Sequence, residues 1–229
     1  MLYFHDWPDV TIHTSKDQPE NLDATKLGRV TYLGAGIAYT LAALPESEAP
    51  KLLALARAGA EKNLAEARLR QSLSGDAREG ALAVRESIAQ TEAKLASIAR
   101  RWPATATAVR EASARMKAET AVGPATAGGD PRVPVRNPDI RGPLGVYYYD
   151  HFSEALAAKG VAEASLPAVP ALKTGNAEVL EYEALNLADG KRSISEIRDL
   201  LSGRYAPVPL AFVAAHFERW ARAGIVTLK

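Results

Sequence analysis

The most regular hydrophobic pattern in the chain runs over residues 23–44. Its apolar positions recur at steps of three and four residues, the spacing of one face of an α-helix, at Leu27, Val30, Leu33 or Gly34, Ile37 and Leu41. Asp23 is a favourable N-cap and Pro45 closes the pattern, so we predict an unusually apolar helix here. Small residues indicate that this helix packs closely against another element; they are Gly34, Ala35, Gly36 and Ala38.

Three further helical patterns follow. The first covers residues 47–74 and stops at Gly75, and the second covers 76–101. The second repeats in alternating steps of three and four, as in a coiled-coil seam, at Val84, Ile88, Thr91, Leu95, Ile98 and Trp102. We expect these two helices to pair as an antiparallel hairpin. Pro103 breaks the line, and a fourth helix is predicted over 104–121.

The next segment, residues 122–143, has no hydrophobic period. It reads VGPATAGGDPRVPVRNPDIRGP, and its Gly and Pro content is typical of a linker or a long surface strap. We therefore expect a domain boundary here. The stretch LGVYYYDHF and a short helix over 152–159 come next, followed by a second Pro-broken connector, SLPAVPALKTGN.

The last part of the chain, residues 177–229, predicts three helices and a strand. Its first helix carries apolar side chains at Val179, Leu180, Tyr182, Leu185 and Leu187. Ser193 and Glu196 have the spacing of a capping box that begins the second helix. The third helix is predicted over 210–223, Gly224 ends it, and IVTLK reads as a terminal strand. Three helices with a β element are the outline of a winged-helix module.

Composition excludes several classes of function. The 229 residues contain 28 Lys and Arg against 27 Asp and Glu, a formal charge of +1, so no global field favours nucleic acid or an anionic membrane. The absence of Cys excludes disulfides, thiolate metal sites and a Cys nucleophile. No apolar run has the length of a membrane span. The compartment stays open, and export is expected only of a parent protein with an upstream signal peptide.

The N-terminal residues carry the candidate chemistry. Short runs over 2–4 and 10–12 read as strands, the second of which ends at His13. A strand can fix an imidazole while loop carboxylates hold it by hydrogen bonds, which is a metal-ligand setting. The alternative is a histidine that caps local backbone at the edge of a loop. Strands this few are only marginally stable without partners, so we expect neighbours that the chain does not supply.

A family resemblance favours the metal ligand. The stretch DVTIHTSKDQPENLDATKLGRVTYLGAGIAYTLAAL resembles the closing segment of zinc-dependent exopeptidases of metallopeptidase family twenty-eight, the aminopeptidase Y and bacterial leucyl aminopeptidase type. In that family a strand delivers the last metal-binding histidine in a pattern like His-Thr-x-x-Asp, followed by a Leu-Asp step and the final helix of the catalytic domain. The matching places are held by His13, Thr14, Ser15, Asp17, Leu22 and Asp23.

The resemblance covers about the first 45 residues and implies an α/β/α sandwich with two zinc ions, in which paired metals activate water for peptide-bond hydrolysis. It implies that His13 binds one zinc and that Asp17 orients its loop. The family's other metal ligands and its catalytic Glu lie upstream of this histidine, and a catalytic zinc needs about three protein ligands. We therefore expect the C-terminal fragment of an aminopeptidase-like hydrolase, with no catalytic residue of its own and inactive in proteolysis as an isolated chain.

These inferences give a mainly α fold in four parts. They are the end of a zinc peptidase domain over 1–45, a helical extension over 46–121, a Pro/Gly-rich linker with a short strand and helix over 122–176, and a winged-helix-like domain over 177–229. The alternative function is a noncatalytic module that binds a protein through its winged helix and helical hairpin, or that self-associates through the helical extension. DNA binding is disfavoured, because the outward candidates of the third helix are Glu218 beside His216, Arg219 and Arg222, not a basic cluster.

Overall fold

The computed structural model describes residues 15, 16, 18–73, 76–118, 129–142, 144–146, 149–172 and 176–229. The fold is mainly helical, as the sequence predicts. The chain divides into two compact units, residues 1–51 and 52–229, and each is described by itself. The strands predicted over 2–4 and 10–12 lie outside the described residues. Within the described part, no helix has the length and apolar content needed to cross a membrane.

The first unit contains a 3-10 turn, η1 (Pro19–Asn21), and the helix α1 (Ala24–Ala43). The predicted N-cap is confirmed, because the Asp23 carboxylate accepts hydrogen bonds from the backbone N–H groups of Thr25 and Lys26. No residue of α1 is buried. A Cβ atom added at Gly36 would meet nothing within 4 Å. The close packing predicted for the small residues of this helix is therefore not found among the described residues.

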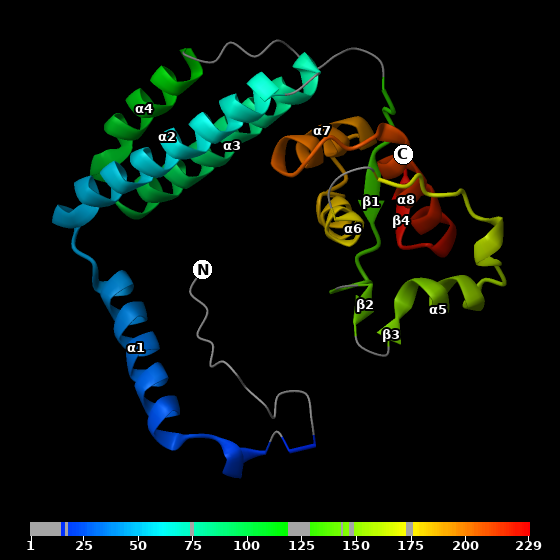
Figure 1. The fold of residues 1–229 in the computed structure, drawn as a ribbon, viewed down its shortest axis with the longest axis horizontal. Helices are drawn as coiled ribbons and strands as arrows, with labels where there is room; N and C mark the ends of the chain where they lie inside the picture. Colours follow the sequence, from blue (N-terminus) through cyan, green and yellow to red (C-terminus); the bar gives the residue numbers. More distant parts are fainter. Residues whose placement is uncertain are drawn as a thin grey trace. The chain divides into compact units, whose positions relative to one another are not determined.

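The second unit begins with three helices, drawn side by side in Figure 1. They are α2 (Ala49–Leu73, which starts at the boundary between the units), α3 (Ala77–Arg101) and α4 (Ala106–Ala118), with a 3-10 turn η3 (Pro103–Thr105) before the last. At Gly80 the helices α2 and α3 come so close that a Cβ would lie 2.8 Å from the Gln71 Cα. The predicted seam of α3 is confirmed, with five of its six residues buried: Val84, Ile88, Thr91, Leu95 and Trp102.

Short strands and one helix follow the three-helix segment. They are β1 (Pro134–Arg136), β2 (Gly145–Val146), β3 (Tyr149–Asp150), α5 (His151–Ala158) and the 3-10 turn η4 (Glu163–Ser165). The strands β2 and β3 pair with each other. The strand β1, which the sequence pattern did not predict, pairs antiparallel with the terminal strand, and Val135 also forms a bridge to Asp189. A stretch of the Pro/Gly-rich segment is thus part of the C-terminal sheet.

The C-terminal fold contains the three predicted helices and the predicted strand, which are α6 (Ala177–Asn186), α7 (Ile194–Arg204), α8 (Leu210–Ala223) and β4 (Val226–Leu228). The capping box of Ser193 and Glu196 is present at the start of α7. Gly224 ends α8 with φ of 78°, a left-handed conformation that favours glycine. The helices enclose the largest hydrophobic core of the described residues, which includes Leu180, Ile194, Ile197, Leu201, Phe212, Val213, Phe217, Trp220 and Ile225.

Candidate functional site

The two residues predicted to form the metal site, His13 and Asp17, lie outside the described residues. The described part of the same loop shows local order. The Gln18 side chain donates to the Ser15 carbonyl at 3.0 Å, and the Asn21 side chain donates to the Lys16 carbonyl at 2.6 Å. These bonds lead the chain directly into the N-cap of α1.

The described residues hold no cluster of metal-binding side chains of their own. Among them, no three His, Asp or Glu side chains lie close enough together to hold a metal ion. The donor set that a catalytic zinc requires is about three protein ligands. The described residues thus do not fit a complete zinc site, and we derive no catalytic step through a metal.

A different site is found in the C-terminal fold. A cavity of about 610 Å³ lies among α5, α6, α8 and the segment around β1. Its polar lining comprises Arg136, Asp150, Glu163, Glu178, Glu181, Asn186, His216 and Arg219. Apolar and aromatic walls are given by Leu144, Phe152, Tyr182, Leu185 and Trp220. This volume and this mixture of apolar walls with a few polar groups are typical of small-molecule sites.

His216 is the most enclosed polar side chain of this cavity. Only 8% of the residue is exposed, and its ring packs edge-on against Phe212 and tilted against Trp220, with centroids 4.6 and 5.5 Å apart. Burial, and secondarily the positive charge of Arg219, lower the pKa of the imidazole to about 4. The ring is therefore neutral at pH 7 and has one nitrogen free to accept a hydrogen bond.

The position of His216 corrects the sequence-based interpretation, which placed it among outward candidates of the third helix. The reason is its spacing, because Phe212, His216 and Trp220 follow one another at four-residue steps on the buried face of α8. That spacing was enough to predict a buried histidine. The sequence-based interpretation instead gave more weight to the polarity of the imidazole and placed His216 on the outer face.

Glu181 lies next to His216 in the cavity lining. Its Oε1 lies 3.6 Å from the His216 Nδ1, which is longer than a hydrogen bond. Burial raises the pKa of Glu181, and the charges of Asp150 and Glu178 raise it further against the opposing effect of Arg219. Since His216 is neutral at pH 7, the two groups do not form an ion pair there. Glu181 is thus a carboxylate in an unfavourable environment.

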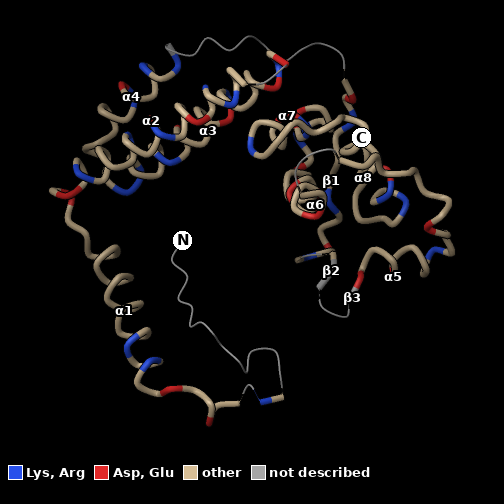
Figure 2. The backbone as a smooth tube through the Cα atoms, in the orientation of Figure 1, with Lys and Arg blue, Asp and Glu red and all other residues tan. Residues whose placement is uncertain are grey.

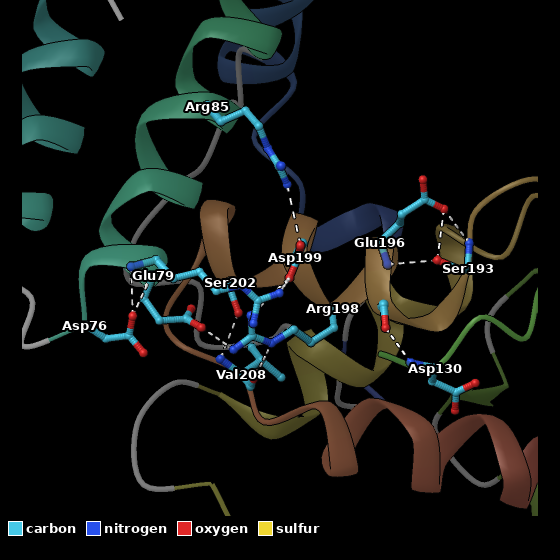
Figure 3. A network of polar contacts seen from close by, with 12 residues as sticks. Asp76, Glu79, Arg85, Asp130, Ser193, Glu196, Arg198, Asp199, Ser202 and Val208 are labelled. Carbon is cyan, nitrogen blue, oxygen red and sulfur yellow. Dashed lines mark hydrogen bonds and ion pairs between the residues drawn. The ribbon is translucent and has the colours of Figure 1, made fainter. Parts of the chain in front are cut away.

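A second polar cluster joins α3 to α7 (Figure 3). Arg198, at its centre, donates to the Val208 carbonyl at 2.6 Å, to Asp199 at 3.0 Å and to Glu79 of α3. The Glu79 and Asp199 side chains are only 8% and 5% exposed. One guanidinium therefore links the two carboxylates and a loop carbonyl in a largely dry interface, where each group depends on the others for its partners.

Further ion pairs extend this α3–α7 seam along both helices. Arg78 donates to Asp199 at 3.0 Å, Arg85 lies 3.7 Å from the same carboxylate, and Arg204 donates to the buried Glu86 at 2.6 Å. Every charged group of the seam has an ionic partner within it, although the Glu79 Oε2 atom is buried without a hydrogen bond. We assign the seam a structural role, because its charges are used mainly in pairing with one another.

A scan against models of known protein families found no match. Searches of curated proteins and of solved structures also found none. The functional argument therefore depends on the residues and on the geometry given above.

Proposed function

We propose that the N-terminal segment, residues 1–45, is the metal-binding end of the catalytic domain of a zinc-dependent exopeptidase. In this proposal His13 binds one of two zinc ions, Asp17 orients the loop that carries it, and a peptide is the substrate of the intact enzyme. The zinc pair would polarise the scissile carbonyl and lower the pKa of a bound water. The chain by itself is inactive in this proposal, because the remaining ligands and the catalytic Glu are not among its residues.

The observation that carries the proposal is the uncovered apolar face of α1. Its large apolar side chains are exposed, and for Leu27, Leu33 and Leu41 the exposed fractions are 55%, 53% and 60%. In Figure 2 the helix is almost entirely tan, with charges only near its start. Burying one such side chain contributes about 1.5–3 kcal/mol. A helix of this kind needs a hydrophobic surface, which the sheet of a catalytic domain would supply.

The loop before α1 gives further support. In the resembled family the metal-binding histidine is followed by a Leu-Asp step and the final helix. Here Asp23 of that step has a defined task, because its carboxylate caps the first turn of α1. An acidic residue at this step therefore has a physical reason in this chain, since it caps the helix that follows.

A longer polypeptide tests the proposal. The gene sequence upstream of Met1 is read for a His-x-Asp and a Glu-Glu pair, and the longer protein is produced with His13→Ala and, as a matched control, His5→Ala. We expect His13→Ala to lower the zinc content and to reduce turnover of aminoacyl-nitroanilides at least about 100-fold. We expect His5→Ala to leave both unchanged. Zinc content unaffected by His13→Ala, or robust turnover by the 229-residue chain alone with added zinc, would overturn the proposal.

A second candidate function rests on the C-terminal fold. We propose that α6, α7 and α8, with the sheet formed by β1 and β4, form a winged-helix-like module that serves protein contact. The antiparallel pairing of β1 with β4 and its bridge to Asp189 support this interpretation. On α8, Arg219 is paired with Glu163, and Glu218 is paired with Arg132. DNA contact is disfavoured, because few cations of α8 are free for phosphates.

Titration with a DNA duplex distinguishes a winged-helix-like module that contacts proteins from one that binds DNA. Fluorescence anisotropy at 50 and 200 mM salt should detect only weak binding, without preference for sequence. Tight binding with a steep loss of affinity as salt rises would instead establish a DNA reader.

A further inference from the structure

The cavity among α5, α6 and α8 has an excess of negative charge. Four carboxylates line it, those of Asp150, Glu163, Glu178 and Glu181, against the guanidinium groups of Arg136 and Arg219. With His216 neutral, the lining has a net charge of −2. The excess adjoins apolar and aromatic walls, and its carboxylates are open to solvent, with the Glu163 and Glu181 side chains 57% and 43% exposed.

Most charged groups of the lining have partners. Arg219 donates to Glu163 at 2.6 Å and lies over the Phe152 ring, and Arg136 donates to two backbone carbonyls. The Asp150 carboxylate caps α5, and hydrogen bonds from Ser153 hold its pKa below the usual range. The carboxylates without a hydrogen bond among the described residues are those of Glu178 and Glu181.

The neutral imidazole of His216 is a second and independent feature of the same cavity. The side chain is nine-tenths buried, lines the cavity and makes no hydrogen bond within the described residues. The aromatic rings of Phe212 and Trp220 pack against this imidazole, and the side chain also forms part of the cavity lining. The ring nitrogens are not among the buried atoms that lack a partner, so they are open to the cavity and a donor that enters it can bond to the acceptor nitrogen.

We propose that this cavity binds a primary ammonium group attached to an apolar stem. Glu181 and Glu178 supply the opposite charge, and the neutral ring of His216 accepts one N–H of the ammonium group. Tyr182, Leu185 and Trp220 provide the walls along which the stem lies. The proposal rests on the cavity lining together with the neutral state of His216, and it goes beyond both proposed functions.

The geometry favours an organic cation over other ligands. A bare metal ion needs several ligands at about 2–2.5 Å from one point, and the described acidic and histidine side chains do not converge in this way. An anion would meet the net negative charge of the lining, and Arg219 is already engaged by Glu163. An ammonium group can donate to the separated acceptors of Glu178, Glu181 and His216, while its apolar stem packs against the apolar walls.

The ammonium group could belong to a lysine side chain or to the N-terminus of a peptide, and two probes distinguish these sources. N-acetyl-lysine N-methylamide carries only the side-chain ammonium, and leucine N-methylamide carries only the terminal one. N-acetyl-norleucine N-methylamide is the neutral reference of similar shape. Each is titrated into the full chain by calorimetry. We expect one ammonium probe to bind at least about 10-fold tighter than the reference, the effect of a charged hydrogen bond.

Variants place the binding in the cavity. Glu181→Gln keeps the shape of the side chain and removes its charge, and we expect it to weaken the favoured probe about 10-fold. Glu183→Gln is the matched control on the same helix, outside the cavity lining, and should leave affinity within about twofold. Far-UV circular dichroism and a melting curve verify that both variants fold. Equal affinities of all three probes, or an affinity unchanged by Glu181→Gln, would overturn the proposal.

Discussion

The helices α1 and α8 are both rich in apolar residues, but the chain treats them in opposite ways. On α8, four large residues are at most 2% exposed: Phe212, Val213, Phe217 and Trp220. No residue of α1 is buried. Both helices have a clear apolar periodicity, so periodicity identifies a face that needs cover but does not say which segment covers it. For α8 the cover lies within the described residues, and for α1 it does not.

Truncating one apolar side chain on each helix gives the largest expected contrast. Phe217→Ala removes a fully buried ring and should lower the free energy of unfolding by about 3–5 kcal/mol, because it leaves a cavity in the core. Leu33→Ala, on a helix without a covering surface, should change it by less than about 0.5 kcal/mol. Urea unfolding followed by far-UV circular dichroism measures both. A large loss with Leu33→Ala would show that α1 has a packing partner within the chain.

The α3–α7 seam gives the second contrast, because it joins two helical segments through charges. Arg198→Met leaves the buried carboxylates of Glu79 and Asp199 without their common partner, and we expect a loss of about 3 kcal/mol. Lys51→Met is the control, since its pair with Glu48 is solvent-exposed and should contribute less than about 1 kcal/mol. Thermal unfolding at pH 7 compares them. Equal small effects would mean that the seam does not stabilise the fold.

Local signals in the sequence were sufficient for the helices. Asp23 and Ser193 begin helices where the pattern placed their N-caps, because capping depends on residues only two or three positions away. The strand β1 was missed, since three residues in a Pro-rich segment carry little periodicity and their partner β4 lies far along the chain. The cavity was missed for the same reason, because its lining comes from elements that only the tertiary fold brings together.

The buried His216 should make stability depend on pH. Its folded pKa of about 4 lies below the usual 6.5, so between these values the unfolded chain binds more protons and stability falls as pH decreases. The full effect is about 3 kcal/mol, present above pH 6.5 and lost as pH approaches 4. Glu181, with its raised pKa, opposes this slope. The same slope in His216→Gln, measured by urea unfolding at pH 7 and 4.5, would contradict the assignment.

Glycine substitutions on the two helices give the smallest expected effects, and these have opposite signs. Gly224→Ala should cost about 1 kcal/mol, because Gly224 ends α8 with a positive φ that alanine adopts poorly. Gly36→Ala has nothing within 4 Å of the added methyl group and should increase helicity, by up to about 1 kcal/mol. Melting curves and circular dichroism measure the two changes. In the longer enzyme proposed above, Gly36→Ala should instead be destabilising, because the small residues of α1 would then lie against a covering surface. If Gly36→Ala also stabilised the longer enzyme, the small residues of α1 would not pack against a covering surface.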